Sequence, residues 1–136
     1  MRFRYPQKVT FKYCDPAGIV FYPRYFEMVN DATEAMFSDA LGAPWEELQQ
    51  TGNVPTARIE AQFTAPSRFG DPLVIEIEIT HLGRSSLGLS FRCLTGTDLR
   101  FAASSTIVYI GLDGKSAPWP DPIRTAITAF MEEPDT

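Results

Sequence analysis

The sequence predicts an α+β fold in which an antiparallel sheet of about five strands wraps around one long central helix. Two observations lead to this class. Residues 24–41 carry a long helical pattern with apolar side chains over a wide stripe, and most of the other segments alternate between apolar and polar residues as strands do. A helix that is apolar over so much of its surface needs cover on several sides. With 136 residues, we expect a single domain spanning residues 1–136.

The N-terminal part is predicted to form a strand, a turn and the start of the helix. Residues 9–14 alternate large apolar side chains with polar or small ones, which is typical of a strand. The run Asp15-Pro16-Ala17-Gly18 is typical of a turn, because proline fixes φ and glycine permits unusual backbone angles. Pro23 is then a favourable first helical residue, since its missing N–H would be unpaired there anyway.

Periodicity predicts the remaining elements. Apolar residues recur at helical spacing from Arg24 to Leu41, and Gly42 is placed to end that helix. One or two further helical turns are expected over residues 44–50. Short connections between the later strands favour antiparallel neighbours, and Asp121-Pro122 begins a short amphipathic helix. The strand patterns cover residues 56–65, 73–80, 87–93 and 99–110.

Composition limits the classes of function. The 12 basic and 17 acidic residues give a net charge of −5, which argues against a nucleic-acid partner. The chain has one histidine, His81, and two cysteines, Cys14 and Cys93, so zinc sites built from several histidines or four cysteines are excluded. We therefore expect any catalysis to depend on a carboxylate.

The sequence also bears on location. No segment approaches the roughly 20 apolar residues that a membrane helix needs, so no membrane partner is expected. The first residues include arginines but no apolar stretch or cleavage site typical of a signal peptide. We therefore predict a cytoplasmic protein with two reduced, buried thiols.

Asp15 is the strongest candidate for a catalytic group. It is predicted to lie in a turn beside Cys14 and Pro16, and seven residues later Tyr22 precedes the helix start at Pro23. The first turn of a helix offers unpaired N–H groups and a positive dipole end. A carboxylate near it can act as nucleophile or base while an N–H stabilises an oxyanion. The alternative is that Asp15 only satisfies the backbone of an Asx turn.

Residues 15–25 resemble the signature of hot-dog-fold acyl-CoA thioesterases of the 4-hydroxybenzoyl-CoA thioesterase type. The matching run reads Asp15-Pro16-Ala17-Gly18-Ile19-Val20-Phe21-Tyr22-Pro23-x-Tyr25. It is specific because it fixes several positions beside one strand and one helix start. The order of strands and helices over nearly the whole chain is also similar to that fold. The resemblance implies a hot-dog fold and a thioester hydrolase.

The resemblance also implies roles for individual residues. In that family the aspartate that matches Asp15 is catalytic, and the residue that matches Tyr22 contributes its main-chain N–H to polarise the thioester carbonyl. The implied reaction is hydrolysis of an acyl-CoA to free acid and CoA, with Asp15 as nucleophile or as general base. No cofactor is implied, because CoA is part of the substrate. Homodimers with shared active sites, pairing into homotetramers, are implied as well.

Two positions bear on the acyl group. Many relatives carry histidine where this chain has Pro23, and the proline version is similar to the 4-hydroxybenzoyl-CoA branch, which favours an aromatic acyl group. Asn30, about two turns into the helix, is a candidate for touching the acyl part, or else a solvent or subunit contact. The alternatives for the function are a thioesterase for short or medium aliphatic acyl-CoA and a non-catalytic acyl-binding hot-dog module.

An acidic protein needs a local cationic patch to hold the phosphates of CoA, because Coulomb attraction is screened within ~10 Å. The turn Gly83-Arg84-Ser85-Ser86 offers an arginine, two hydroxyls and free N–H groups, and related thioesterases often place basic residues in this hairpin region. Arg84 and Ser85 are therefore predicted to bind the CoA portion. The other candidates are Arg58, Arg68 and Arg124, and the alternative for Arg84 is a solvated turn residue.

Overall fold

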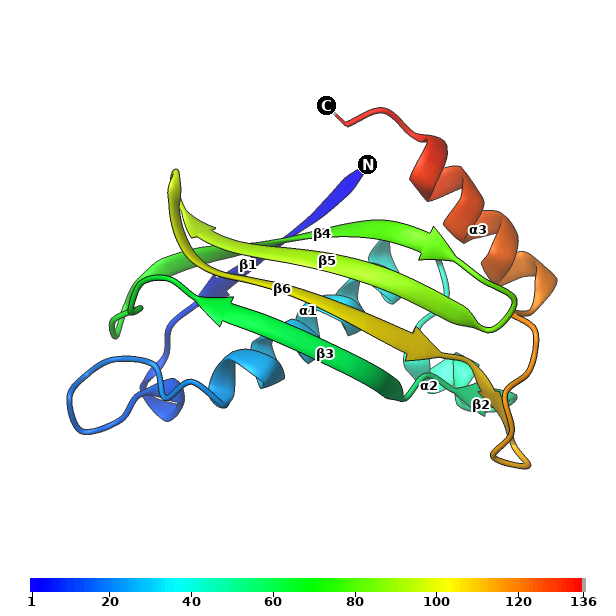
Figure 1. The fold of residues 1–136 in the computed structure, drawn as a ribbon, viewed down its shortest axis with the longest axis horizontal. Helices are drawn as coiled ribbons and strands as arrows, with labels where there is room; N and C mark the ends of the chain where they lie inside the picture. The colour runs from blue at the N-terminus through cyan, green and yellow to red at the C-terminus, as the bar shows by residue number, and fades with distance from the viewer. Residues whose placement is uncertain (136) are drawn as a thin grey trace.

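One antiparallel sheet dominates the computed structural model, which describes residues 1–135. Its five strands lie in the order β1–β4–β5–β6–β3, so β1 and β3 form the two edges (Figure 1). The strands are β1 (Arg2–Lys8), β3 (Thr56–Phe63), β4 (Pro72–Leu82), β5 (Ser86–Thr95) and β6 (Asp98–Val108). Two short strands, β2 (Gly52–Asn53) and β7 (Ile110–Gly111), pair separately. The predicted number of strands in the main sheet is confirmed.

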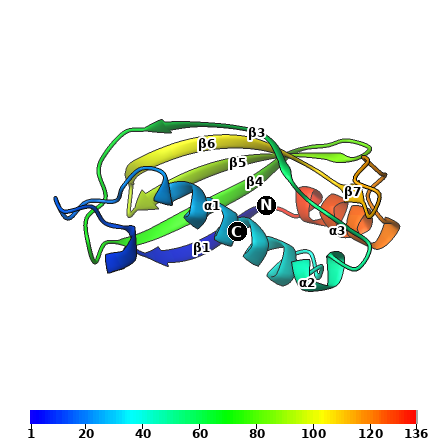
Figure 2. The ribbon, with the colours of Figure 1, turned by 90° about the horizontal axis from the view of Figure 1, so that it is seen from below.

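The long helix α1 (Arg24–Asp39) lies along one face of the sheet, as Figure 2 shows from below. Its buried residues, Tyr25, Met28, Val29, Ala32, Thr33, Met36 and Phe37, cover much of its circumference, as its broad apolar stripe predicted. Facing them are buried side chains at alternate positions of the central strands, Ile75, Ile77, Leu89 and Phe91 among them. Each such side chain stabilises the fold by about 1.5–3 kcal/mol when fully buried. This core fixes the direction of α1 and hence the position of its N-terminus.

The predicted strand over residues 9–14 is wrong. Residues 11–13 form a 3₁₀ turn, η1 (Phe11–Tyr13), and the edge strand is instead β1, which pairs with β4. Pro6 within β1 is tolerated because an edge strand needs hydrogen-bond partners on one side only. The alternation of residues 9–14 reflects a turn that buries Val9 and Tyr13 and leaves Phe11 exposed.

Strand β3 has the predicted position but not the burial that its alternation suggests. Its apolar residues Ile59 and Phe63 are 39% and 45% exposed, and its far side has no strand beside it in the part of the chain described. An edge with apolar side chains and unpaired backbone groups is a template for pairing with another chain.

The end of the molecule opposite the N-terminus of α1 holds the hairpin between β4 and β5 and two short helices. The helices are α2 (Trp45–Leu48) and α3 (Asp121–Glu132), and both were predicted. Arg124 of α3 donates hydrogen bonds to the backbone oxygens of Gly83 (2.6 Å) and Arg84 (3.1 Å), which fixes the hairpin. None of the helices in residues 1–135 is long and apolar enough to span a membrane.

Candidate active site

Asp15 lies in a tight turn that the surrounding backbone closes. Its N–H donates to the Ile19 oxygen at 2.9 Å, and Gly18, whose φ of +81° favours glycine, donates to the Asp15 oxygen at 3.0 Å. The carboxylate oxygen Oδ1 accepts the Ala17 N–H at 2.9 Å, so the Asx turn is present. Within residues 1–135, Oδ2 accepts no hydrogen bond from the protein. The turn therefore orients the carboxylate and leaves one of its oxygens available.

Tyr22 stands beside this turn, at the N-terminus of α1. The Phe21 N–H donates to the Tyr13 oxygen at 2.9 Å, and Cys14 pairs with Val20, so the chain entering and the chain leaving the turn run side by side. Pro23 precedes the first helical residue and has no N–H. In the described chain, the N–H of Tyr22 also has no protein acceptor. The helix start thus offers an unpaired main-chain donor, as the sequence predicted.

Residues 64–71, which connect β3 and β4, form hydrogen bonds with both the Asp15 turn and the first turn of α1. The Ser67 oxygen accepts the Val20 N–H at 2.8 Å, and the Phe69 N–H donates to the Gly18 oxygen at 3.1 Å. The buried hydroxyl of Tyr25, in the first turn of α1, donates to Ser67 Oγ at 2.8 Å. Burial raises the pKa of that phenol, so it is neutral at physiological pH. The Asp15 turn and the helix start are both tied to residues 64–71.

An open apolar cavity of about 540 Å³ lies between the helix start and this connection. Phe63 forms one wall, with its ring stacked on Tyr25 at 5.6 Å between centroids and 5.8 Å from Tyr22. The lining residues are Ile19, Val20, Tyr22, Tyr25, Phe63, Thr64, Ala65 and Pro66. We refer to this cavity as the acyl cavity. Because it is apolar and borders Tyr22, it suits an uncharged group whose polar end faces the helix N-terminus.

Asn30 lines a second cavity, of about 210 Å³, further along the groove between α1 and β3. Its other walls include Phe26, Trp45 and Ile59. The rings of Phe63, on the acyl cavity, and Phe26, on the second cavity, meet edge to face at 6.3 Å. Asn30 is therefore on the same groove as the acyl cavity, but one chain alone does not bring it to Asp15.

A half-buried ion pair contacts residues 64–71. Arg100 of β6 donates to Asp71 Oδ2 at 2.7 Å and to Asp98 Oδ2 at 3.0 Å. The Arg68 N–H, followed by the Arg100 side chain, lowers the pKa of Asp71 below its usual range. The hydrogen bond with Asp71 in turn raises the pKa of Arg100. This end of the sheet thus carries a fixed, fully charged pair beneath the site.

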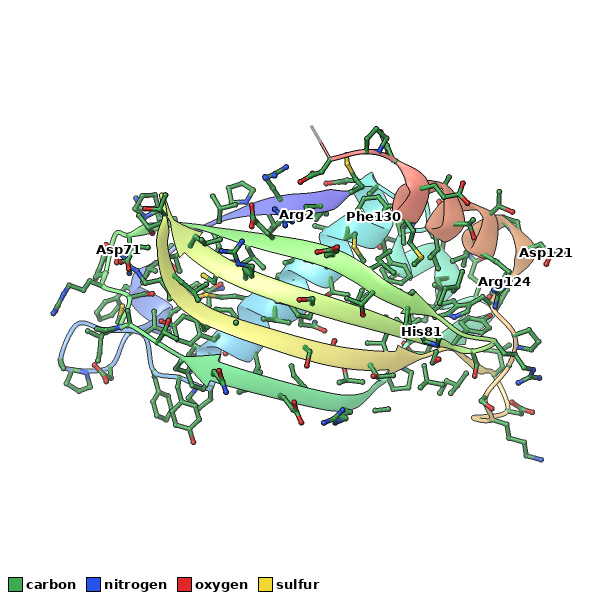
Figure 3. All side chains as sticks on the ribbon, turned by 45° about the horizontal axis from the view of Figure 1, so that its top comes forward. Arg2, Asp71, His81, Asp121, Arg124 and Phe130 are labelled. Atoms are coloured by element: carbon green, nitrogen blue, oxygen red, sulfur yellow. The ribbon has the colours of Figure 1, made fainter. Side chains whose placement is uncertain are left out.

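Arg84 and Ser85 lie at the opposite end of the same chain. Figure 3 shows this separation, with Asp71 at one end of the sheet and His81 and Arg124 at the other. Strand β5 has 10 residues, which corresponds to roughly 30 Å between the ends at about 3.3 Å per residue. A single chain therefore does not bring the predicted CoA-binding residues together with Asp15. Exposed His81 lies at the Arg84 end and takes no part in the site around Asp15.

Both cysteines are free, and of these two thiols, both predicted to be buried, only Cys93 is buried, whereas Cys14 is half-buried. Cys93 is fully buried, and burial raises its pKa to about 12, so the thiolate does not form at physiological pH. Cys14 is free, and its Sγ lies 3.7 Å from the Thr10 oxygen. No group of three potential metal ligands occurs among residues 1–135. Asp15 remains the predicted reactive group, and it lies in the turn that precedes the start of α1.

Sequence reasoning missed the contribution of residues 64–71, of Phe63 and of Arg100. The turn signal at Pro66–Pro72 predicted only a connection between two strands. Nothing local indicates that Ser67 meets Val20, because the two are 47 positions apart in the chain. The alternation of residues 56–65 predicted that Phe63 lies on the apolar face of the strand. That pattern would have indicated a pocket wall only if the C-terminal end of this strand had also been predicted to lie next to α1.

The fold has close counterparts among solved structures. The 1,4-dihydroxy-2-naphthoyl-CoA thioesterase of Synechocystis superposes with a TM-score of 0.88 at 24% identity, covering 98% of this chain and 100% of that one. The 4-hydroxybenzoyl-CoA thioesterase of Pseudomonas sp. strain CBS-3 gives 0.82 at 25% identity, covering 92% and 98%. A gentisyl-coenzyme A thioesterase gives 0.84 at 28%, covering 92% and 99%. These likenesses confirm the hot-dog fold.

Sequence comparison gives the family. The Pseudomonas enzyme is 32% identical over 83 residues, a match that spans 59% of each chain, and the Synechocystis 1,4-dihydroxy-2-naphthoyl-CoA hydrolase is 23% identical over 130 residues, or 92% and 94% of the two chains. A profile of the Thioesterase-like superfamily matches residues 9–127. The chain therefore belongs to the Thioesterase-like superfamily. This membership confirms the predicted family and the predicted enzyme class, a thioester hydrolase.

Proposed function

We propose that the protein hydrolyses an aromatic acyl-CoA to the free acid and CoA, with Asp15 as the catalytic carboxylate. The observation that carries this proposal is an oriented carboxylate in the turn that leads to α1, together with an unpaired main-chain N–H at the N-terminus of that helix, where Tyr22 borders an apolar cavity. The thioester carbonyl oxygen accepts the Tyr22 N–H, and the positive end of α1 stabilises the negative charge that develops on it.

Two routes to the products fit this arrangement. In the first, Asp15 Oδ2 attacks the carbonyl carbon, the C–S bond breaks to release the CoA thiolate, and water then cleaves the mixed anhydride to acid and regenerated carboxylate. In the second, Asp15 takes a proton from water as the water oxygen attacks the carbonyl carbon, and the thiolate leaves with a proton. Both routes need the same carboxylate and the same oxyanion donor.

The aromatic acyl group is supported by the cavities and by the relatives. Three aromatic rings, those of Tyr22, Tyr25 and Phe63, gather at the acyl cavity, and aromatic rings favour offset or edge contacts with one another. Asn30 on the neighbouring cavity can hydrogen-bond a polar ring substituent. The relatives described above are named for 4-hydroxybenzoyl-CoA, 1,4-dihydroxy-2-naphthoyl-CoA and gentisyl-coenzyme A.

Thiol release from a panel of acyl-CoAs tests this substrate class. The panel compares benzoyl-CoA and its hydroxylated forms with acetyl-CoA and hexanoyl-CoA, and kcat/KM is measured for each. We expect the hydroxylated aromatic esters to give the highest values. A higher value for hexanoyl-CoA would keep the thioesterase and replace the aromatic group with an aliphatic one. Binding without turnover of any ester would indicate an acyl-binding module.

The proposal includes a homodimer in which two copies pair through strand β3. The free edge of β3 and its exposed Ile59 and Phe63 support this pairing. When the β3 strands of two copies pair antiparallel, the two copies are related by a twofold axis perpendicular to the sheet. The partner is therefore rotated by 180° in the plane of the sheet. The partner's β4–β5 hairpin then lies at the same end as Asp15. This arrangement would bring Arg84 and Ser85 of one copy toward the site of the other.

The pairing of dimers into tetramers and the cytoplasmic location stay predictions from the sequence. The mass of the assembly in solution tests the tetramer.

Replacing Arg84 with alanine is expected to weaken binding of the CoA nucleotide. KM for an acyl-CoA should rise about 10- to 100-fold, the loss typical of one charge-assisted hydrogen bond to a phosphate. KM for the matching acyl-pantetheine, which lacks the nucleotide, should not change. Lys115, another exposed cation at the same end, provides the control through Lys115→Ala. Equal KM changes for both substrates would contradict the assignment of Arg84.

Two substitutions at Tyr22 separate the main chain from the phenol. Tyr22→Phe should keep kcat within about threefold, because the proposed donor is the backbone. Tyr22→Pro removes the N–H and should lower kcat about 10²–10³-fold, as expected for the loss of an oxyanion donor. Proline is tolerated at the start of a helix, and this N–H donates to no protein group in the described chain. Circular dichroism checks folding. A collapse of kcat in Tyr22→Phe would instead implicate the phenol.

A further inference from the structure

Arg100 is an unusual residue for a strand of this sheet, because its side chain is charged and yet only 11% exposed. Its guanidinium donates to Asp71, Asp98 and the Pro66 oxygen, the last at 3.1 Å. Its own backbone oxygen accepts the N–H groups of Thr64 (2.9 Å) and Ala65 (3.3 Å). Arg100 therefore contacts both ends of residues 64–71, residues 64–66 at one end and Asp71 at the other.

Residues 64–71 in turn contact the site at several points. Residues 64–66 line the acyl cavity. The Ser67 oxygen accepts the Val20 N–H, and the Phe69 N–H donates to the Gly18 oxygen, so both contacts reach the Asp15 turn. Ser67 also accepts the hydroxyl of Tyr25, in the first turn of α1. The same short segment thus sets the position of the carboxylate, of the Tyr22 N–H and of one cavity wall relative to one another.

We propose that Arg100 is a positioning residue for thioester hydrolysis. It acts through residues 64–71 to fix the position of the Asp15 turn relative to the start of α1. The proposal rests on the function proposed above. The Arg100 side chain does not line the acyl cavity, so its effect reaches the reaction through its contacts with Pro66 and Asp71 and through the segment between them. A misplacement of about 1 Å at a reacting group can cost 10²-fold in rate, so a segment that sets two reacting groups at once has a large effect on kcat.

The geometry requires arginine in particular. The planar guanidinium reaches two carboxylates and a backbone oxygen at the same time, from two different nitrogens. An ammonium group is a compact point charge and cannot span these acceptors together. Lysine at this position should therefore keep part of the effect through Asp71, and an uncharged residue of similar length should keep none.

The test compares Arg100→Met with Arg100→Lys in the full-length protein, with thiol release as the readout at a temperature well below both melting temperatures. We expect Arg100→Met to lower kcat about 10- to 100-fold while KM changes by less than about threefold. Arg100→Lys should retain a kcat between those of Arg100→Met and the wild type. A kcat for folded Arg100→Met within twofold of wild type would overturn the proposal.

Two comparisons distinguish positioning from a general loss of stability. Ile127 is fully buried in α3, so Ile127→Ala, or the milder Ile127→Val, lowers the melting temperature without touching residues 64–71. This control should keep kcat within twofold, and an equal fall in kcat at a matched loss of stability would contradict the proposal. Arg100→Met should also cost less than about threefold in an Asp15→Asn background, because the carboxylate it positions is gone.

The double variant also separates the two proposals. If Arg100→Met costs as much in the Asp15→Asn background as in the wild type, Arg100 does not act through Asp15 and the positioning role fails. If Asp15→Asn alone leaves kcat unchanged, the proposed catalytic carboxylate fails instead.

Discussion

Asp15→Asn will lower kcat for acyl-CoA hydrolysis about 10²–10⁴-fold, with a change in KM of less than about threefold. The amide oxygen of asparagine can still accept the Ala17 N–H, so the Asx turn and its surroundings stay in place. What is lost is the negative charge that either attacks the carbonyl or takes a proton from water. The loss therefore falls on the chemical step. Steady-state assays of free thiol measure both constants.

Asp113→Asn is the matched control for this variant. Asp113 forms the same kind of turn, in which its Oδ1 accepts the Lys115 N–H at 3.0 Å and Gly114 has a φ of +80°. The turn lies at the opposite end of the molecule, after β7. The same change of charge there should leave kcat within twofold. Near wild-type turnover by Asp15→Asn would show that another group performs the chemistry.

Ile59→Lys will dissociate the proposed dimer and lower the specific activity more than 10-fold at low protein concentration. A lysine on an edge strand is a feature that natural proteins use to prevent pairing, and here it would place two like charges across the proposed twofold axis. Because the site is proposed to need both copies, activity should return as the protein concentration rises. Analytical ultracentrifugation and activity are measured over the same dilution series.

Leu112→Lys provides the control, since Leu112 is an exposed apolar residue outside β3. It should change neither mass nor activity. A monomeric Ile59→Lys protein with full activity would contradict the shared site. A dimeric Ile59→Lys protein would contradict pairing through β3.

Much of the site could be predicted because its signals are local. The turn residues after Asp15 and the proline before Arg24 determine the backbone conformation over a few positions, and the helix starts at Arg24, one residue after the predicted start at Pro23. The broad stripe of α1 likewise predicted a helix covered by a sheet. Such features depend on neighbouring residues in the chain and need no knowledge of tertiary contacts.

The features that could not be predicted depend on contacts between distant residues. Arg100 holds residues 64–71 across 29 or more positions, and nothing near Arg100 in the sequence indicates that it contacts Pro66 and Asp71. Alternation over residues 9–14 predicted a strand, but β1 occupies the edge of the sheet instead, because pairing with β4 is available to residues 2–8. Arg84 was expected to bind the CoA portion, and the topology puts it at the end of the sheet opposite Asp15 of the same chain.

The exposure of β3 shows where a single chain is insufficient. Its alternating pattern predicted a buried apolar face, yet Ile59 and Phe63 are 39% and 45% exposed. A sequence pattern encodes burial in the final assembly as well as within one chain. The difference between the pattern and the exposed surface is therefore itself an argument for a partner on this edge.

Thiol release by the wild-type protein and Asp15→Asn, measured side by side with 4-hydroxybenzoyl-CoA, tests the central claim most directly. The expected result is saturable release of one free thiol per ester consumed by the wild type, with that release nearly abolished in the folded variant. Equal rates for the two proteins, or saturable binding of the ester without thiol release by either, would contradict it.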